Sequence, residues 1–159
     1  MIIKTKKAGL ALLAGVMIFA FISCNWTNES ENTERANIQA YLSSHPNDTF
    51  ELKPSGLYYM DIVVGTGKLA EIHDTSYVLF KVYYLNGTLI QSNYGKDTLV
   101  YPVNEGYYIA GFEEALSYMR GGGKSKALLP SNLAYGNYTP LLYEIYLVKL
   151  AAGPGPDKK

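Results

Sequence analysis

A two-residue repeat in the side-chain pattern, followed by a tight-turn dipeptide, constrains the fold of this chain more than any other feature. The repeat begins at Leu57, and a long run from Tyr77 to Leu85 is typical of a β-strand. Asn86-Gly87 is the strongest short-range hairpin signal and returns the chain through residues 88–91. The residues expected to share one face of the long strand are Val78, Phe80, Val82 and Tyr84. Three more strands are predicted at residues 98–103, 124–129 and 141–148.

One helix is expected to interrupt these strands. Ile109, Phe112, Leu116 and Met119 recur at helical spacing. The three glycines at 121–123 are expected to end this helix, because glycine adopts the left-handed conformation of a C-cap at little cost. Glu113 and Glu114 are interpreted as charges that complement the helix N-terminus. The predicted fold class is therefore α+β, with an antiparallel sheet of about five strands wrapped around one short helix.

The N-terminal segment resembles a secretory signal. Three lysines at positions 4, 6 and 7 precede an uncharged apolar run from Ala8 to Ser23, which is shorter than the about 20 residues of a membrane span. The run ends in Phe21-Ile22-Ser23-Cys24, which is similar to a bacterial lipobox. We therefore expect residues 1–23 to be a lipoprotein signal peptide and Cys24 to carry the lipid. The alternative is a signal anchor with an inert Cys24.

Charge and composition exclude several classes of function. The chain has 14 basic and 14 acidic residues, and loss of the three leader lysines leaves a net charge of −3. This balance argues against a general nucleic-acid-binding protein. The single cysteine excludes an intramolecular disulfide and a thiolate cluster, and His45 and His73 are not in ligand spacing, so no metal site is predicted.

The chain between Cys24 and the strands divides into two parts. Residues 25–34 are polar and acidic, which is typical of a flexible tether. Ile38, Tyr41 and Leu42 then form one apolar stripe, which predicts a helix of about ten residues at 35–44 that packs on the domain or frays. The predicted organisation is a tether with a short helix at 24–54, one domain at 55–150 and a disordered tail at 151–159.

Five segments, in order, resemble an FKBP-type peptidyl-prolyl cis-trans isomerase domain. They are Ser55–Tyr59 with Gly65–Gly67, Asn86–Ile90, Tyr108–Leu116, Pro130–Gly136 and Pro140–Leu147. The resemblance covers residues 55–150. It implies an FKBP-like fold and isomerisation of Xaa-Pro bonds without a cofactor. The implied partners are proline-containing segments of exported or envelope proteins.

The resemblance also implies a binding pocket. The Ile109 N–H would bind the substrate carbonyl, Phe112 would form the pocket floor, and the Tyr135 hydroxyl would bond the ligand. The remaining wall would come from Phe80, Ile90, Gln91, Tyr108 and Tyr143, with Tyr138 and Leu141 as a reduced roof. Buried aromatic rings are most often plain core residues, and this is the alternative for each ring.

Two positions and the length of one loop differ from the family pattern. Gln91 and Phe112 stand where the family has aspartate and tryptophan. Only seven residues, 136–142, separate Tyr135 from Tyr143, about half the usual number. Two functions follow as alternatives: a membrane-tethered isomerase, or an FKBP-like binding or chaperone module of an envelope complex with weak or no activity. A purely structural accessory domain whose aromatic groove receives a partner peptide is a third. We expect a monomer anchored at Cys24, in the outer membrane rather than the inner.

Overall fold

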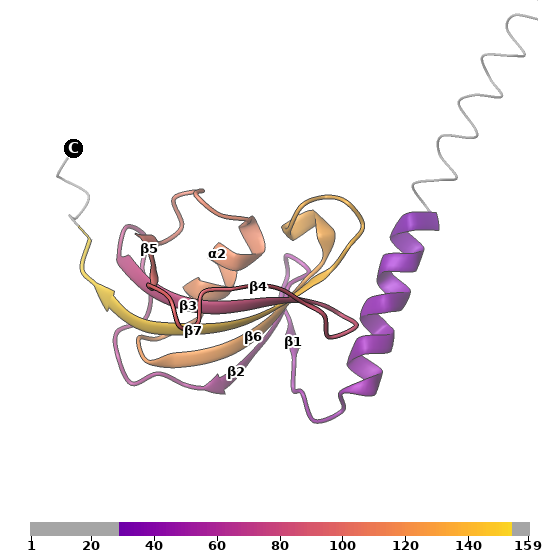
Figure 1. The fold of residues 1–159 in the computed structure, drawn as a ribbon, viewed down its shortest axis with the longest axis horizontal. Coiled ribbons are helices and arrows are strands. Elements are labelled where there is room, and N and C mark those ends of the chain that lie inside the picture. The colour runs from indigo at the N-terminus through magenta and orange to yellow at the C-terminus, as the bar shows by residue number, and fades with distance from the viewer. Residues whose placement is uncertain (1–28, 154–159) are drawn as a thin grey trace, which may run out of the picture.

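The computed structural model describes residues 29–153, which form a helix, a seven-stranded antiparallel sheet and a second helix (Figure 1). The strands follow the order β1-β2-β6-β7-β3-β4, and β5 also pairs with β3. This agrees with the predicted α+β class, but the sheet has seven strands against the about five predicted, and the two-residue β1 at its edge lies where no strand was expected. The elements are β1 (Glu51–Leu52), β2 (Tyr58–Val63), β3 (Thr75–Tyr84), β4 (Leu89–Ser92), β5 (Leu99–Pro102), α2 (Ala110–Ser117), β6 (Gly123–Leu129), η1 (Ser131–Leu133) and β7 (Leu141–Ala151).

The main core lies between the sheet and α2, which covers one sheet face (Figure 1). Along β3, Val78, Phe80 and Val82 are buried while the residues between them are half-buried, so the predicted alternation is confirmed for these three, whereas Tyr84 at the strand end is exposed. From α2, Phe112 and Leu116 meet this face. Burial of large apolar side chains on both elements supplies most of the driving force for this packing.

The end of α2 differs from the prediction. The helix stops at Ser117, and Met119 and Arg120 lie outside it. Arg120 pairs instead with Leu69 in an isolated bridge. The glycines at 121–123 form the turn into β6, where the Gly121 N–H donates to the Lys68 carbonyl at 2.9 Å. Tertiary pairing with the 65–69 segment thus ends the helix before its apolar pattern does.

The N-terminal helix, residues 29–44 of the described chain, begins earlier than predicted. Its first residues fall in the segment predicted to be a tether, so that prediction is wrong for 29–34. The helix lies across one end of the sheet (Figure 1), where Ile38 and Tyr41 pack against Leu128 and Leu142. These two sheet residues point away from the main core. The N-terminal helix therefore explains why three successive residues are buried in both β6 and β7.

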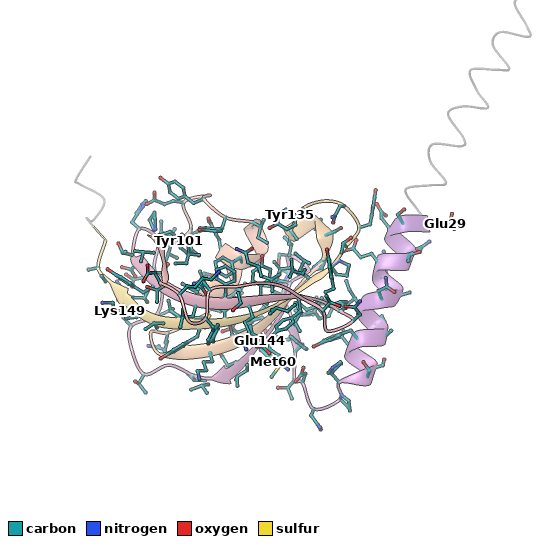
Figure 2. The ribbon with its side chains drawn as sticks, in the orientation of Figure 1. Glu29, Met60, Tyr101, Tyr135, Glu144 and Lys149 are labelled. Carbon is teal, nitrogen blue, oxygen red and sulfur yellow. The ribbon has the colours of Figure 1, made fainter. Side chains whose placement is uncertain are left out.

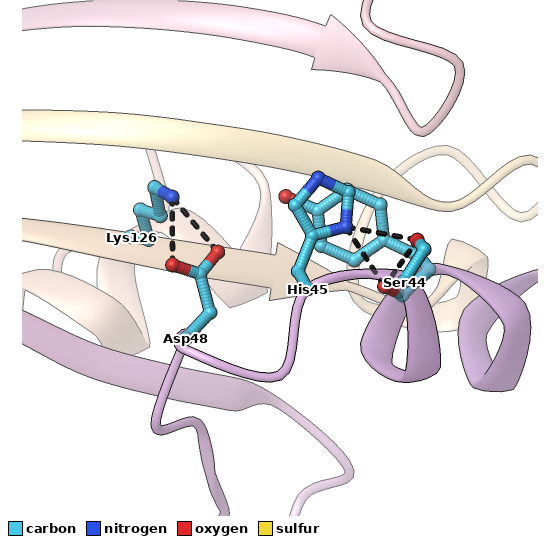
Figure 3. Close-up of polar contacts among 5 residues, drawn as sticks. Ser44, His45, Asp48 and Lys126 are labelled. Atoms are coloured by element: carbon cyan, nitrogen blue, oxygen red, sulfur yellow. Dashed lines mark hydrogen bonds and ion pairs between the residues drawn. The ribbon is translucent and has the colours of Figure 1, made fainter.

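The C-terminal end of this helix is fixed by side-chain contacts (Figure 3). Asp48 accepts from the Lys126 ammonium of β6 at 2.8 Å and 3.0 Å. His45 stacks on Tyr41 with ring centroids 4.1 Å apart, and its Nδ1 lies 2.9 Å from the Tyr41 carbonyl oxygen. The turn after the helix is therefore tied both to the sheet and to the helix itself.

Several predictions concern residues outside the described range. The signal peptide, Cys24 and residues 25–28 lie outside it, as do residues 154–159 of the predicted tail. Ala151 of that predicted tail is the last residue of β7, where it pairs with Thr75. Within residues 29–153, neither helix has the length and apolar character needed to cross a bilayer.

Candidate active site

A small cavity opens where β3, β4, β7, α2 and the loop after η1 meet. Its volume is about 70 Å³. All seven lining residues belong to the predicted site: Phe80, Gln91, Tyr108, Ile109, Phe112, Tyr135 and Tyr143. Figure 2 shows Tyr135 on the α2 side of the sheet, whereas Met60 and Glu144 lie on the opposite side. Residues from separate parts of the sequence thus meet at one point on the α2 face.

The base of the cavity is a cluster of aromatic rings. Phe112 is 2% exposed, and its ring centroid lies 5.8 Å from Phe80, 5.3 Å from Tyr143 and 5.7 Å from Tyr108. The Phe80 and Phe112 rings are edge-to-face. Rings at these separations attract one another and hold a fixed shape. The result is a rigid, apolar floor.

Gly111 sets the position of Phe112. A Cβ at Gly111 would lie 2.6 Å from the Leu129 Cγ and 3.1 Å from the Leu133 Cβ. A larger residue would therefore push α2 away from β6 and η1. Glycine at this position lets the first turn of α2 approach the sheet closely, which brings the Phe112 ring into the cavity floor.

Ile109 precedes α2 as its N-cap, with φ −60° and ψ 141°. Its carbonyl oxygen accepts from the Phe112 and Glu113 N–H groups at 3.0 Å and 3.2 Å. Within residues 29–153, its own N–H donates no hydrogen bond. A helix N-terminus leaves its first N–H groups without intrahelical partners. The Ile109 N–H is therefore available to a carbonyl oxygen of a bound peptide.

Glu113 holds the loop that carries Tyr108. Its carboxylate is buried and accepts from the Gly106 N–H at 3.0 Å and from the Tyr108 N–H at 2.9 Å. The interpretation of Glu113 as a helix-terminal charge missed this role. Its neighbour Glu114 accepts instead from Ser55 Oγ and from the Tyr118 hydroxyl. Glu113 is thus a positioning residue for the cavity wall.

Two tyrosines form the rim. Tyr135 is 66% exposed, whereas Tyr143 is buried. Burial, followed by the adjacent Tyr135 hydroxyl, raises the pKa of Tyr143 above its ordinary range. Tyr143 thus stays protonated further into the alkaline range than a free tyrosine, and this side of the cavity carries no charge.

The other predicted residues lie farther from the floor. Ile90 and Leu141 line a second cavity of about 100 Å³, which shares Gln91, Tyr135 and Tyr143 with the first. Tyr138 lines neither of these cavities. It faces a groove beside the N-terminal helix, together with Glu34 and Ile38. The short loop thus turns Tyr138 toward the helix instead of over the site.

Asn93 supports the site and was not predicted from the sequence. It lies in the loop between β4 and β5, beside β3. Its Oδ1 accepts from the Phe80 N–H at 2.7 Å, and its Nδ2 donates to the Val78 carbonyl at 2.9 Å. The side chain thus takes the place of a strand partner in the gap between β4 and β5. An asparagine followed closely by glycine indicates a turn, and no local pattern distinguishes this supporting role from an ordinary turn residue.

The part of the chain that the structure describes contains no cluster of His, Cys, Asp or Glu able to hold a metal ion. Behind this site, Tyr101 is buried and packs on Tyr108 at 4.7 Å and on Phe112 at 6.2 Å between ring centroids. The site thus consists of apolar walls, three tyrosine side chains, one amide side chain and one backbone N–H.

Comparison with known proteins places this geometry in a family. The model of the family described as FKBP-type peptidyl-prolyl cis-trans isomerase matches residues 67–148, just over half of the chain. The macrophage infectivity potentiator of Trypanosoma cruzi is 35% identical over 112 residues, 63% of this chain and 56% of that protein. The chloroplastic peptidyl-prolyl cis-trans isomerase FKBP16-1 of Arabidopsis thaliana is 28% identical over 122 residues, 61% of this chain and 59% of that protein. The chain thus matches less than three fifths of the length of these relatives.

Solved structures share the fold. FkpA from Escherichia coli superposes with a TM-score of 0.69 at 20% identity, covering 96% of this chain and 75% of that one. A peptidyl-prolyl isomerase from Pseudomonas syringae pv. tomato gives 0.64 at 20% identity, covering 79% and 96%. AtFKBP13 gives 0.60 at 26% identity, covering 64% and 98%. With the match of the family model, these similarities show that the chain belongs to the FKBP-type peptidyl-prolyl cis-trans isomerase family.

Proposed function

We propose that this protein catalyses the cis-trans isomerisation of Xaa-Pro bonds. The observation that carries the proposal is the aromatic cavity over Phe112 with the unbonded Ile109 N–H at its edge. Rotation about an Xaa-Pro bond has a barrier of about 20 kcal/mol because the planar bond is stabilised by resonance. A site of this kind needs no nucleophile, general acid or metal.

The walls and the backbone donor would act together. The planar imide is more polar than the twisted transition state, so an apolar cavity from which water is excluded favours the twisted form. The flat rings of Phe80 and Phe112 suit a proline ring. The Ile109 N–H would hold a substrate carbonyl in place while the bond turns, and the Tyr135 hydroxyl would bond the chain at the rim.

The second candidate is a binding or chaperone module with weak or no isomerase activity. It is favoured by the open mouth of the site, since Tyr138 faces the N-terminal helix and Gln91 is exposed. An open mouth admits water and weakens the effect of desolvation.

A measurement of proline isomerisation separates the two candidates. We expect the protein at micromolar concentration to accelerate isomerisation of short peptides with varied residues before proline. Tyr135→Phe removes the rim hydroxyl and should lower kcat/KM by about fivefold. Tyr138→Phe is the matched control, because its ring lies outside the cavity, and it should leave the rate unchanged. No acceleration by the wild type would favour the binding module.

The cellular setting follows from the signal-like N-terminus. We propose that Cys24 is lipid-modified, that the monomer is tethered in the cell envelope, with the outer membrane more favoured than the inner, and that its substrates are exported or envelope proteins. Acyl chains supply about 0.8 kcal/mol per buried methylene, enough for two or three chains to hold a domain on a bilayer. Cys24→Ser should abolish acyl labelling and release the protein from membranes. Retention of the variant in the membrane fraction would overturn the anchor.

A further inference from the structure

A large groove lies between the N-terminal helix and the β3–β4 hairpin, with a volume of about 640 Å³. The helix contributes Asn37, Ala40 and Ser44, which lie on one flank of the helix. The hairpin contributes Tyr84 and Asn86, and the loop before β7 contributes Thr139. We name this surface the helix–hairpin groove.

The helix–hairpin groove adjoins the candidate active site through the second cavity. Tyr84 and Thr139 line both the groove and the second cavity. The second cavity in turn shares Gln91, Tyr135 and Tyr143 with the cavity over Phe112. The three hollows therefore lie next to one another in a row, and we call this row the track from the proline site to the N-terminal helix.

The chemistry of the groove suits an uncharged chain. None of its lining residues carries a charge. The amides of Asn37 and Asn86 and the hydroxyls of Ser44 and Thr139 can bond the backbone of an extended peptide, which has unpaired N–H and C=O groups. The rings and Leu85, Pro140 and Ala40 offer apolar contact to its side chains. A charged segment would lose its water here without gaining a partner.

We propose that the helix–hairpin groove binds an extended, uncharged segment of the substrate polypeptide that flanks the proline. The N-terminal helix is then a second binding surface of the enzyme as well as a connection to the N-terminus. The inference rests on the proposed function, because the track begins at the proline site. It predicts that a long peptide is used better than a short one, since only a long peptide can reach the helix.

The test compares two substitutions on the two flanks of the helix. Asn37→Trp fills the groove, and Gln39→Trp places the same ring on the other flank, where the exposed Gln39 lines none of the three hollows. Two substrates are used: a proline tetrapeptide, and the same sequence extended to about twelve residues with uncharged side chains. The measured quantity is the ratio of kcat/KM for the long peptide to that for the short one.

The wild type and Gln39→Trp should prefer the long peptide by about fivefold or more, and Asn37→Trp should lose most of that preference. An equal preference for the long peptide in all three proteins would contradict the proposal that the groove binds the substrate. Binding of the fluorescently labelled long peptide, followed by anisotropy, separates this inference from the proposed function. If the wild type has no isomerase activity but Asn37→Trp alone weakens binding, the groove is a peptide-binding surface and the isomerase proposal is wrong. If both variants bind the peptide as the wild type does, the groove does not bind substrate, whatever the isomerase activity.

Discussion

The Glu34 carboxylate of the N-terminal helix accepts a hydrogen bond from the Ser131 hydroxyl at 2.7 Å, across 97 residues of sequence. It also accepts from the Ser131 backbone N–H. Both groups are buried. Ser131 begins η1, and the same loop carries Tyr135 to the rim of the cavity. The N-terminal helix is therefore bonded directly to the segment that forms one wall of the candidate active site.

Loss of this carboxylate should loosen both the helix and the loop. Glu34→Ala leaves the buried Ser131 N–H without a partner, and we expect a loss of about 1–3 kcal/mol in the free energy of unfolding. Urea denaturation followed by circular dichroism measures it. Glu31→Ala is the control, because Glu31 is exposed on the same helix and should change stability by less than about 0.5 kcal/mol. Equal effects of the two substitutions would contradict the bond.

Glu34 also explains why the start of the helix was not predicted. Glu34, Ile38 and Tyr41 follow the i, i+4, i+7 spacing of one buried stripe, yet the first of them is charged. A buried carboxylate is rare, and it occurs here because two Ser131 donors satisfy it. Ser131 lies 97 residues away in the sequence, so the polar, acidic composition of residues 25–34 alone favoured a flexible tether there.

The Glu113 carboxylate accepts two backbone hydrogen bonds from the loop that bears Tyr108, and its removal should loosen that loop. Glu113→Gln replaces one carboxylate oxygen by an NH₂ group, which would face either the Gly106 or the Tyr108 N–H. We expect a loss of about 1–3 kcal/mol in stability and a lower kcat/KM, because the loop bearing Tyr108 is no longer held. Thermal unfolding and the peptide assay measure the two effects.

The neighbouring residue supplies the control for Glu113. Glu114→Gln keeps an oxygen that can accept from Ser55 Oγ or from the Tyr118 hydroxyl, so its effect on stability should be smaller. If KM and kcat for peptides are the same in Glu113→Gln and the wild type while stability falls, Glu113 is a purely structural residue and does not position the site.

The ionised Asp74 carboxylate should stabilise the fold at neutral pH and cease to do so in acid. Burial alone would raise the pKa of this carboxyl, but the Lys68 ammonium at 2.9 Å and the Glu71 N–H at 3.0 Å outweigh burial and lower it. The folded state therefore binds fewer protons than the unfolded state in this range. The stabilisation is complete above the ordinary carboxyl pKa of 3.8 and is lost as the pH falls through the lower folded value.

The Asp74→Asn variant tests this sign. We expect its Tm at neutral pH to be about 5 °C below that of the wild type. The two melting temperatures should converge in strong acid, where the wild-type carboxyl is protonated as well. A constant difference from neutral pH to acid would mean that the ionised form of Asp74 adds nothing to stability.

The strands were accessible from the sequence because they depend on local pattern, whereas the residues of the candidate site were expected only from the family resemblance over residues 55–150. The two-residue period around Val78 and Phe80 reports a sheet face directly. The residues that were misplaced depend on distant contacts. Arg120 leaves the helical pattern to pair with Leu69, and Tyr138 turns toward the N-terminal helix, with φ 57°. Neither interaction leaves a trace in the spacing of nearby residues.

Removal of the Ile109 N–H, the backbone donor at the cavity, tests its proposed role in catalysis without changing the aromatic floor. Proline fits the φ of −60° at Ile109, so Ile109→Pro deletes the N–H in a compatible backbone conformation. Ile109→Ala is the reference, because it also loses the isoleucine side chain but keeps the N–H. With both variants shown to be folded by circular dichroism, the measurement is kcat/KM for isomerisation of a proline tetrapeptide. We expect Ile109→Pro to be about tenfold less active than Ile109→Ala. Equal activity of the two variants would contradict this expectation.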